Sequence, residues 1–156
     1  MLTLRGCSLK LKGKLYAACV RSVMVYGSET WAMKEEDVRR LERTEMQMVR
    51  WMCGARLKDE IRSSELRNRL GIDSIVNHLR TNRLRWFGHV KRADDNNWIK
   101  QCQNVLVPGR CGKGRPRKRW NDNIKEDPRK LEINENLASD RDAWKIAIKK
   151  HPSNPC

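Results

Sequence analysis

The most concentrated group of charged residues in the sequence is a run of cationic side chains near residue 115. Five of them, Lys113, Arg115, Arg117, Lys118 and Arg119, fall within seven residues, and Arg110 precedes them. Phosphates carry the opposite charge, and long cationic side chains release condensed counterions when they contact a nucleic-acid backbone. The run is therefore predicted to contact phosphates of RNA or DNA. A nuclear-import signal and a plain solvated linker are the alternatives that its composition also allows.

The centre of this run, Gly114-Arg115-Pro116, resembles the core of an AT-hook. In that motif an extended arginine arm enters the minor groove of A/T-rich DNA, where a narrow groove strengthens the negative potential. Residues 107–116 contain two prolines and three glycines, which exclude regular secondary structure. Residues 107–119 are therefore expected to form a flexible basic arm.

A second group of cations lies on one expected helix: Arg80, Arg83, Arg85, Lys91 and Arg92. They are the predicted phosphate ligands of this segment. Trp86, Phe87 and His89 are interleaved with them, and aromatic rings between cations can stack on unpaired bases. However, Trp86 and Phe87 fall on or beside the apolar face, which favours packing in the core.

The remaining candidates for chemistry are weak. His78, His89, Cys102 and Cys111 lack the close pairing that a structural zinc site needs. Asp94-Asp95 lies in a polar, turn-like stretch, without the rigid hairpin and third carboxylate of a two-metal polymerase site. No phosphate-binding glycine loop is present. The sequence thus predicts no catalytic residue, no metal and no cofactor.

The whole chain is strongly basic. Its 156 residues hold 34 Lys and Arg against 19 Asp and Glu, for a net charge of +15. Residues 78–120 contain twelve basic groups and only two acids, Asp94 and Asp95. Such a balance favours an anionic partner, nucleic acid before a membrane surface, and no small-molecule substrate is indicated. No apolar run reaches the length of a membrane span or of a signal-peptide core, so an intracellular protein with free thiols is expected.

These side chains must be positioned by helices, because no strand pattern longer than a few residues occurs. Helices are predicted over 9–26, over 35–53 with Gly54 as C-cap, from Ser63 or Ser64 to Gly71, and over 74–91. A short helix is expected over 117–126, ending near Pro128, and a final helix after a capping Ser139. The predicted fold class is mainly α, a small irregular helical array with a flexible basic Gly/Pro arm.

Two apolar faces are predicted on these helices. The helix over 35–53 presents Val38, Leu41, Met48 and Met52, and the helix over 74–91 presents Ile75, Leu79, Trp86 and Val90. Each face is expected to pack in the core. For the first face, pairing with a helix of another protein is the alternative.

Four short sequence motifs, taken in order, suggest a family. They are Tyr26-Gly27-Ser28-Glu29-Thr30-Trp31, then residues 84–92 (LRWFGHVKR), residues 114–122 (GRPRKRWND) and residues 140–144 (DRDAW). This order resembles the C-terminal part of the reverse-transcriptase polyproteins of LINE-like, non-LTR retrotransposons of the RTE/BovB or jockey-like kind. The likeness covers residues 14–150. It implies that residues 14–31 end the polymerase near its thumb, and that the remainder binds template RNA or target DNA.

The sequence also departs from that family, since the palm motif with its paired aspartates, the endonuclease residues and a Cys/His knuckle are absent. We therefore expect a non-catalytic, nucleic-acid-binding fragment that acts in the nucleus. Retained polymerase activity is the catalytic alternative, and primer extension would test it. Its expected segments are a thumb-like end (1–33), a helical core (34–106), the basic arm (107–119) and a C-terminal helical segment (120–156). A helical protein-interaction module and a degenerate remnant without activity are the alternatives. Within these four motifs, the side chains of Trp31 and Trp144 are expected to pack in the core. Gly88 is expected to let a neighbouring helix approach, and His89 is expected to be exposed or hydrogen-bonded within the protein.

Overall fold

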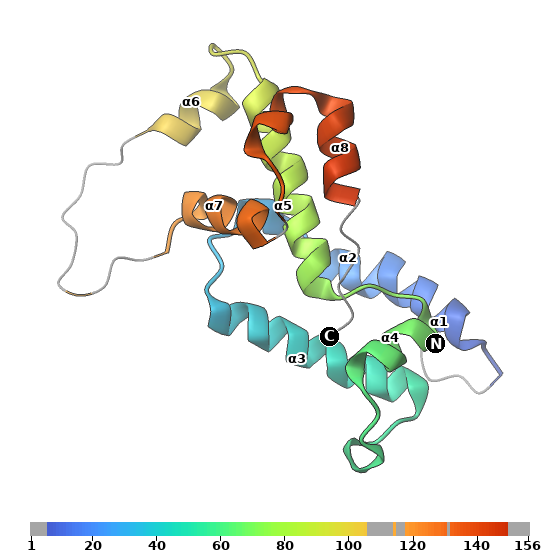
Figure 1. The fold of residues 1–156 in the computed structure, drawn as a ribbon. Coiled ribbons are helices and arrows are strands. Elements are labelled where there is room, and N and C mark those ends of the chain that lie inside the picture. The colour runs from blue at the N-terminus through green and yellow to red at the C-terminus, as the bar shows by residue number, and fades with distance from the viewer. Residues whose placement is uncertain (1–5, 106–113, 115–117, 131, 150–156) are drawn as a thin grey trace. The chain divides into compact units, whose positions relative to one another are not determined.

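The structure is a computed structural model that describes residues 6–105, 114, 118–130 and 132–149. The described residues form helices and turns and include no strand, which confirms the predicted mainly α fold class (Figure 1). Most of the predicted basic arm, including Arg110, Lys113, Arg115 and Arg117, lies outside the described residues.

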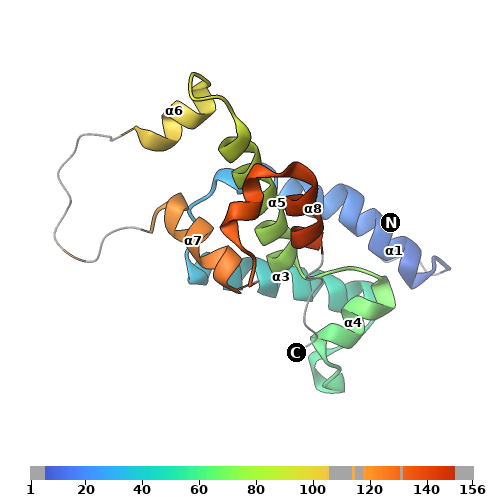
Figure 2. The ribbon, with the colours of Figure 1, turned by 45° about the horizontal axis from the view of Figure 1, so that its top comes forward.

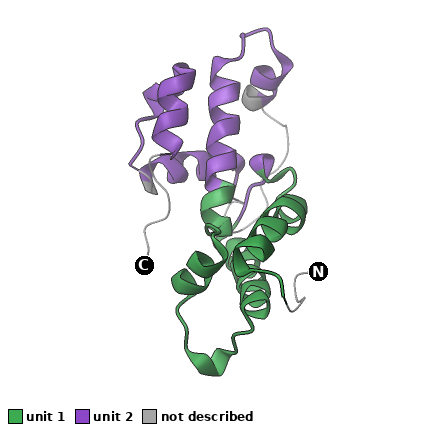
Figure 3. Cartoon of the chain, turned by 90° about the vertical axis from the view of Figure 1, so that its right-hand side faces the viewer, with its two compact units in different colours: residues 1–28, 34–79, 152–156 green, residues 29–33, 80–151 purple. Residues whose placement is uncertain are grey.

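The chain divides into two compact units (Figure 3). Among the described residues, unit 1 comprises 6–28 and 34–79, and unit 2 comprises 29–33 and 80–149. The boundary at Leu79 and Arg80 falls inside one long helix, α5 (Ile75–Arg92). The four segments expected from the sequence group the residues differently, and that division stays a prediction.

Unit 1 begins with a helix that is continuous but not uniform. Ser8 caps α1 (Leu9–Leu15), a π-helical stretch follows over Tyr16–Arg21, and α2 (Ser22–Met24) ends the run. The predicted helix over 9–26 is therefore confirmed, with its end two residues earlier. In a π-helix, backbone hydrogen bonds connect residues that are five apart, so Tyr16 and Arg21 can face the same side of the helix.

The rest of unit 1 consists of two helices, each ended by a left-handed glycine. The helix α3 (Glu35–Cys53) ends at Gly54 with φ 66°, and α4 (Ser63–Leu70) ends at Gly71 with φ 65°. Both C-caps were predicted, since only glycine adopts this conformation without a steric penalty. The predicted N-cap of α4 was wrong: Arg62 occupies that position without a side-chain bond, and Ser63 is the first helical residue.

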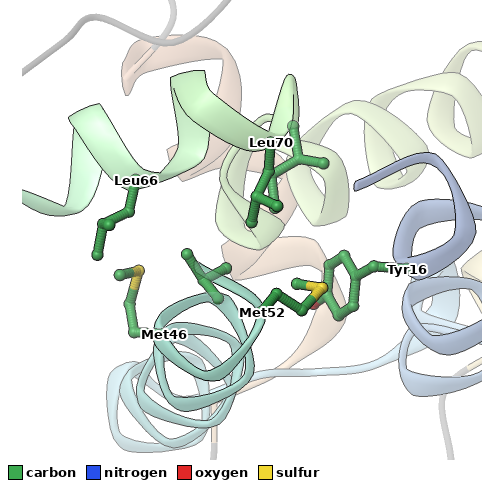
Figure 4. Close-up of a cluster of buried hydrophobic side chains, with 7 residues drawn as sticks. Tyr16, Met46, Met52, Leu66 and Leu70 are labelled. Carbon is green, nitrogen blue, oxygen red and sulfur yellow. The ribbon is translucent and has the colours of Figure 1, made fainter. Parts of the chain in front are cut away.

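The core of unit 1 forms where α1, α3 and α4 meet (Figure 4). Its buried side chains are Tyr16, Met46, Val49, Met52, Leu66, Leu70 and Ile72. Gly13 makes the close approach possible, because a Cβ there would clash with the backbone carbonyl of Leu70. The predicted face of α3 needs correction: Met52 is buried and Met48 packs beside it, but Val38 and Leu41 are half-buried.

A buried carboxylate, that of Glu45, joins the helices of unit 1. Its Oε1 accepts hydrogen bonds from Arg21 at 2.8 Å and from the Tyr16 hydroxyl at 3.4 Å. Its Oε2 accepts from the backbone N–H of Ile75 at 3.1 Å and from Arg67 at 3.3 Å. Glu45 is completely buried, so these donors compensate the cost of removing its charge from water.

Unit 2 contains most of α5 and the helices that follow it. Asn97 caps α6 (Trp98–Asn104), which the sequence did not predict. The helix α7 (Trp120–Lys130) starts three residues later than the expected 117–126 and continues through the buried Pro128, four residues beyond the expected end. Proline cannot donate to the carbonyl of residue 124, yet burial of Pro128 and an ion pair of Asp127 hold this last turn in place.

The last helix, α8 (Arg141–Lys149), follows a 3₁₀ turn over Glu135–Ser139. Its predicted capping residue, Ser139, was wrong. The carboxylate of Asp140 accepts from the backbone N–H groups of Asp142 and Ala143 at 2.9 and 3.2 Å. The Ser139 hydroxyl instead donates to the carbonyl of Asn136. Asp is as good an N-cap as Ser, and the distance to the first helical turn decides between the two.

The core of unit 2 forms around Trp144 of α8. Its other buried members are Leu84, Phe87, Ile124, Ile133, Ala138 and Ile148. The Trp144 indole N–H donates to the carbonyl of Leu84 at 2.9 Å, and its ring lies 6.0 Å from that of Phe87. The predicted burial of Trp144 and Phe87 is confirmed. Trp86 is half-buried, so its expected packing on the core face of α5 holds only in part.

Residues 29–33 belong to unit 2 through contacts with α7. The indole N–H of Trp120 donates to the carbonyl of Glu29 at 2.6 Å, and the Asn123 amide donates to the carbonyl of Trp31 at 3.5 Å. The Trp31 side chain itself is 40% exposed. The expected packing of its indole therefore holds only in part, and the backbone of this segment makes the polar contacts.

Candidate nucleic-acid interface

Two of the five cations predicted on α5 turn towards the protein. Arg83 is 4% exposed, and its guanidinium lies 2.7 Å from the Asp127 carboxylate. Arg80 is half-buried and lies 3.8 Å from the other oxygen of Asp127. Both side chains help to hold α7 against α5, so they are poorly placed to bind a phosphate from solution.

The other three predicted cations of α5 lie nearer to solvent. Arg85 and Lys91 are exposed, and Arg92 is half-buried. The Lys91 ammonium lies 5.6 Å from the centre of the Phe87 ring, a cation–π distance. Arg92 donates to the carbonyl of Ala138 at 2.7 Å, which fixes the position of its guanidinium.

Of the predicted arm, the structure describes Gly114 and the last two residues. Lys118 is half-buried and its ammonium lies 2.7 Å from the Glu126 carboxylate. Arg119 is exposed, and its backbone N–H donates to Asp122 at the start of α7. The other members, Arg110, Lys113, Arg115 and Arg117, lie outside the described residues, so their contribution stays a prediction.

Arg85 and Arg92 meet cations that the sequence did not single out. They line a pocket of about 520 Å³ in unit 2, here called the α5–α8 basic pocket. Figures 1 and 2 both show α8 beside α5. The described residues that line the pocket are Arg85, His89, Arg92, Arg141, Trp144, Lys145, Ile148 and Lys149. Five of these carry a permanent positive charge and none is acidic.

Helical spacing explains why these side chains converge. Arg85, His89 and Arg92 recur at intervals of four and three residues on α5, and Arg141, Lys145 and Lys149 recur at intervals of four on α8. Side chains at these spacings share one face of a helix. Each stripe lies beside the buried surface that joins the two helices, so the two stripes border the same pocket.

Close contact between the helices depends on Gly88. A Cβ at this position would lie 2.5 Å from the Trp144 indole and 3.0 Å from the guanidinium of Arg92. The prediction that Gly88 lets a neighbouring helix approach is confirmed. His89 is exposed, which is one of the two states expected for it. Its ring centre lies 5.4 Å from that of Trp86.

The pocket has the chemistry of a phosphate site. Guanidinium groups donate two parallel hydrogen bonds to phosphate oxygens, and ammonium groups act as mobile point charges. The tryptophan and isoleucine side chains give the pocket an apolar floor, which weakens competition from water. Such a set of side chains suits phosphate groups, and contacts of this kind do not read base sequence.

Arg141, Lys145 and Lys149 recur at helical spacing in the sequence, but the sum of charge over the region conceals this pattern. Residues 121–156 contain equal numbers of basic and acidic groups, so the net charge of this segment is zero. Helical spacing separates the charges, because Arg141, Lys145 and Lys149 share a face. The periodicity of charge on the expected last helix, rather than its sum, would have located these residues.

Asp95 and Cys102, two residues considered for catalytic or metal chemistry, do not line the α5–α8 basic pocket. Asp95 is exposed and accepts from Lys100 at 2.7 Å, and this hydrogen bond lowers the pKa of its carboxyl. Among the residues that the structure describes, no group of His, Cys, Asp and Glu could hold a metal ion. Cys102 is exposed, and Cys111 lies outside the described part. No helix within the described ranges is long and apolar enough to cross a membrane.

Comparison with known proteins gives one informative match. No protein-family model matches the chain, and no solved structure does. Over 158 aligned residues, the chain is 22% identical to an uncharacterized transposon-derived protein of Caenorhabditis elegans. The alignment covers 93% of this chain and 56% of that protein, so the chain spans about half the length of this relative. This likeness supports a transposon origin for the chain.

Proposed function

We propose that the protein is a non-catalytic, transposon-derived module that binds the phosphate backbone of RNA or DNA. The observation that carries the proposal is the α5–α8 basic pocket, where five of the described lining residues are cations and none of them is an acid. Side chains of one sign gathered in this way repel each other in the free protein. A bound polyanion would relieve that repulsion and release its own counterions.

The net charge of +15 supports the same proposal. Cations of the arm, Lys113, Arg115, Arg117, Lys118 and Arg119, would add contacts along the same polyanion. Phosphate contacts fix the register of a partner without reading its sequence, so we expect binding with little sequence preference.

The finer identity is also a proposal. The four sequence motifs resemble the C-terminal region of LINE-like retrotransposon reverse transcriptases. The transposon-derived relative supports a transposon origin without specifying the type of transposon. On this basis we propose a post-polymerase region that serves template RNA or target DNA in the nucleus. A primer-extension assay with Mg²⁺ tests the non-catalytic part, because any templated product would contradict it.

The binding proposal is tested with two variants of equal charge. One replaces Arg85, Lys145 and Lys149 by Gln, and its control replaces the exposed Lys10, Lys14 and Arg39 of unit 1 by Gln. Each variant carries +12 in place of +15, since three charges are removed. Binding to matched RNA and DNA oligonucleotides is measured by fluorescence anisotropy over a range of salt concentrations.

The pocket variant is expected to bind more weakly and to depend less on salt. Each lost phosphate contact reduces the slope of log K against log salt by about 0.7 to 0.9, so three contacts reduce it by about 2 to 3. The control should keep most of the original slope. Equal losses in both variants would show that only net charge matters, and the pocket would lose its role.

A further inference from the structure

Unit 1 contains a second pocket, whose main feature is an exposed tryptophan. The pocket has a volume of about 630 Å³ and is bordered by α3 and the segment that leads to α4. Trp51 lines it and is 66% exposed, and Leu57 lines it and is 77% exposed. The buried Met46 lies at the same pocket. These side chains form an apolar recess that is open to solvent.

The charged side chains around this recess are mainly positive. Arg43 and Arg50 of α3 both line it, and they lie seven residues apart on the helix. Glu42 is its one acidic lining residue among those described, and the Glu42 carboxylate lies 3.5 Å from the guanidinium of Arg67. Since Arg67 offsets Glu42, the two arginines determine the charge that a ligand would meet. Gln47 adds an amide that can both donate and accept hydrogen bonds.

We infer that this pocket holds an unpaired base of a single-stranded nucleic acid, stacked on Trp51, with neighbouring phosphates near Arg43 and Arg50. An indole face beside cations suits a base, because every base has a flat π-face attached to an anionic backbone. A base within a duplex is already stacked on both faces and does not fit. This inference rests on the proposed function and specifies it: unit 1 selects single strands.

A helix of another protein is the other occupant that an apolar recess could take. The charges favour the nucleic acid, since an apolar helix face would bury Arg43 and Arg50 without offering them a counter-charge. Removing a cation from water without a partner is unfavourable. A phosphate on each side of the stacked base supplies that partner.

The test replaces Trp51 by Ala and by Phe. The matched control is Trp98→Ala, because Trp98 is 79% exposed and does not line this pocket. Affinities for a 12-nucleotide single-stranded RNA, the same DNA strand and the corresponding DNA duplex are measured by anisotropy at one salt concentration. Circular dichroism and thermal unfolding confirm that each variant is folded, and the exposed position of Trp51 makes loss of the fold unexpected.

Trp51→Ala is expected to weaken single-strand binding by about 5- to 150-fold, the range that loss of one base–aromatic stack produces. Duplex binding should change little. Trp51→Phe should recover most of the affinity, because phenylalanine keeps a flat aromatic face, and Trp98→Ala should bind like the wild type.

Four outcomes would overturn the inference. Unchanged single-strand affinity in Trp51→Ala, while the Arg85, Lys145 and Lys149 variant loses binding, would leave the proposed function standing without this base site. An equal loss in Trp98→Ala would mean that exposed indoles bind generally. A change of self-association in sedimentation, with oligonucleotide affinity unchanged, would assign the recess to a protein partner. If the wild type binds no oligonucleotide, the proposed function itself fails, and the base site fails with it.

Discussion

At the residue scale, Gly88 gives the sharpest prediction. Gly→Ala in a helix normally stabilises a protein by about 0.5 to 1 kcal/mol. Here a Cβ would meet the Trp144 indole at 2.5 Å, so Gly88→Ala should instead destabilise by about 1 to 3 kcal/mol, the usual cost of overpacking. Urea unfolding measures the sign directly.

A double variant checks the cause of that effect. Trp144→Ala removes the ring that the new methyl group would meet, so adding Gly88→Ala to it should cost little. Two residues in contact are expected to show such non-additivity. Fully additive free energies of unfolding would mean that the indole is not what Gly88 accommodates.

Tyr16 gives a prediction about pH. Burial raises the pKa of its hydroxyl above the ordinary 10.0, and the Glu45 carboxylate raises it further. A raised pKa in the folded state means that the neutral phenol contributes stability below about pH 10, and that this contribution is lost as the pH rises towards the folded pKa.

Wild type should therefore lose more stability than Tyr16→Phe between about pH 9 and pH 11. Lysine deprotonation affects both proteins, so the difference between their free energies of unfolding isolates Tyr16. Parallel curves for the two proteins over this range would contradict the assignment.

At the element scale, the helices of unit 1 depend on the single carboxylate of Glu45. It accepts from the π-helical stretch, from α4 and from the first residue of α5. Glu45→Gln should destabilise by about 3 kcal/mol or more, because the buried Arg21 would lose its counter-charge.

Glu42→Gln is the matched control for that experiment. Glu42 pairs with the same Arg67 at 3.5 Å but is 45% exposed, so its removal should cost under about 1 kcal/mol. Thermal unfolding of the two variants side by side measures the contrast. Similar losses of stability would show that burial of the carboxylate does not matter.

The element scale is also where sequence patterns succeeded best. Gly54 and Gly71 marked helix ends, because few residues other than glycine reach a positive φ without strain. The continuation of α7 through Pro128 was not predictable, since it depends on the distant Arg83 that holds Asp127. Arg83 follows Leu79 by four residues and so shares the core face of α5, but this spacing could not identify its buried partner, Asp127, 44 residues later.

At the scale of the whole molecule, the sequence correctly indicated a helical fold, but not the α5–α8 basic pocket. Arg85 and Arg92 were predicted, whereas Arg141, Lys145 and Lys149 came to the same pocket only through the fold. Which of two cations faces inward also depends on the position of Asp127, a property that no local pattern contains. For the same reason Arg80, which lies 3.8 Å from Asp127, was indistinguishable from Arg85 in the sequence.

A whole-molecule prediction follows from having two cationic regions. Neutralising Lys113, Arg115, Arg117, Lys118 and Arg119 should reduce the salt slope of binding by about 3 to 4, which is less than five contacts would give. Lys118 is the reason, because it already pairs with Glu126 at 2.7 Å. Salt titration of this variant, alone and combined with the pocket variant, should give additive decreases. An unchanged slope would reduce the arm to a solvated linker.

Residues 29–33 have a consequence for how the protein is made. They belong to unit 2, yet their polar partners Trp120 and Asn123 lie about ninety residues further along the chain. A ribosome adding about 5 to 20 residues per second delivers those partners roughly 5 to 20 s later. Unit 1 receives its remaining helices partway through that interval, since it extends to Leu79, whereas residues 29–33 still lack Trp120 and Asn123. Synthesis therefore imposes an order, in which unit 1 can close first and unit 2 must wait for its last third.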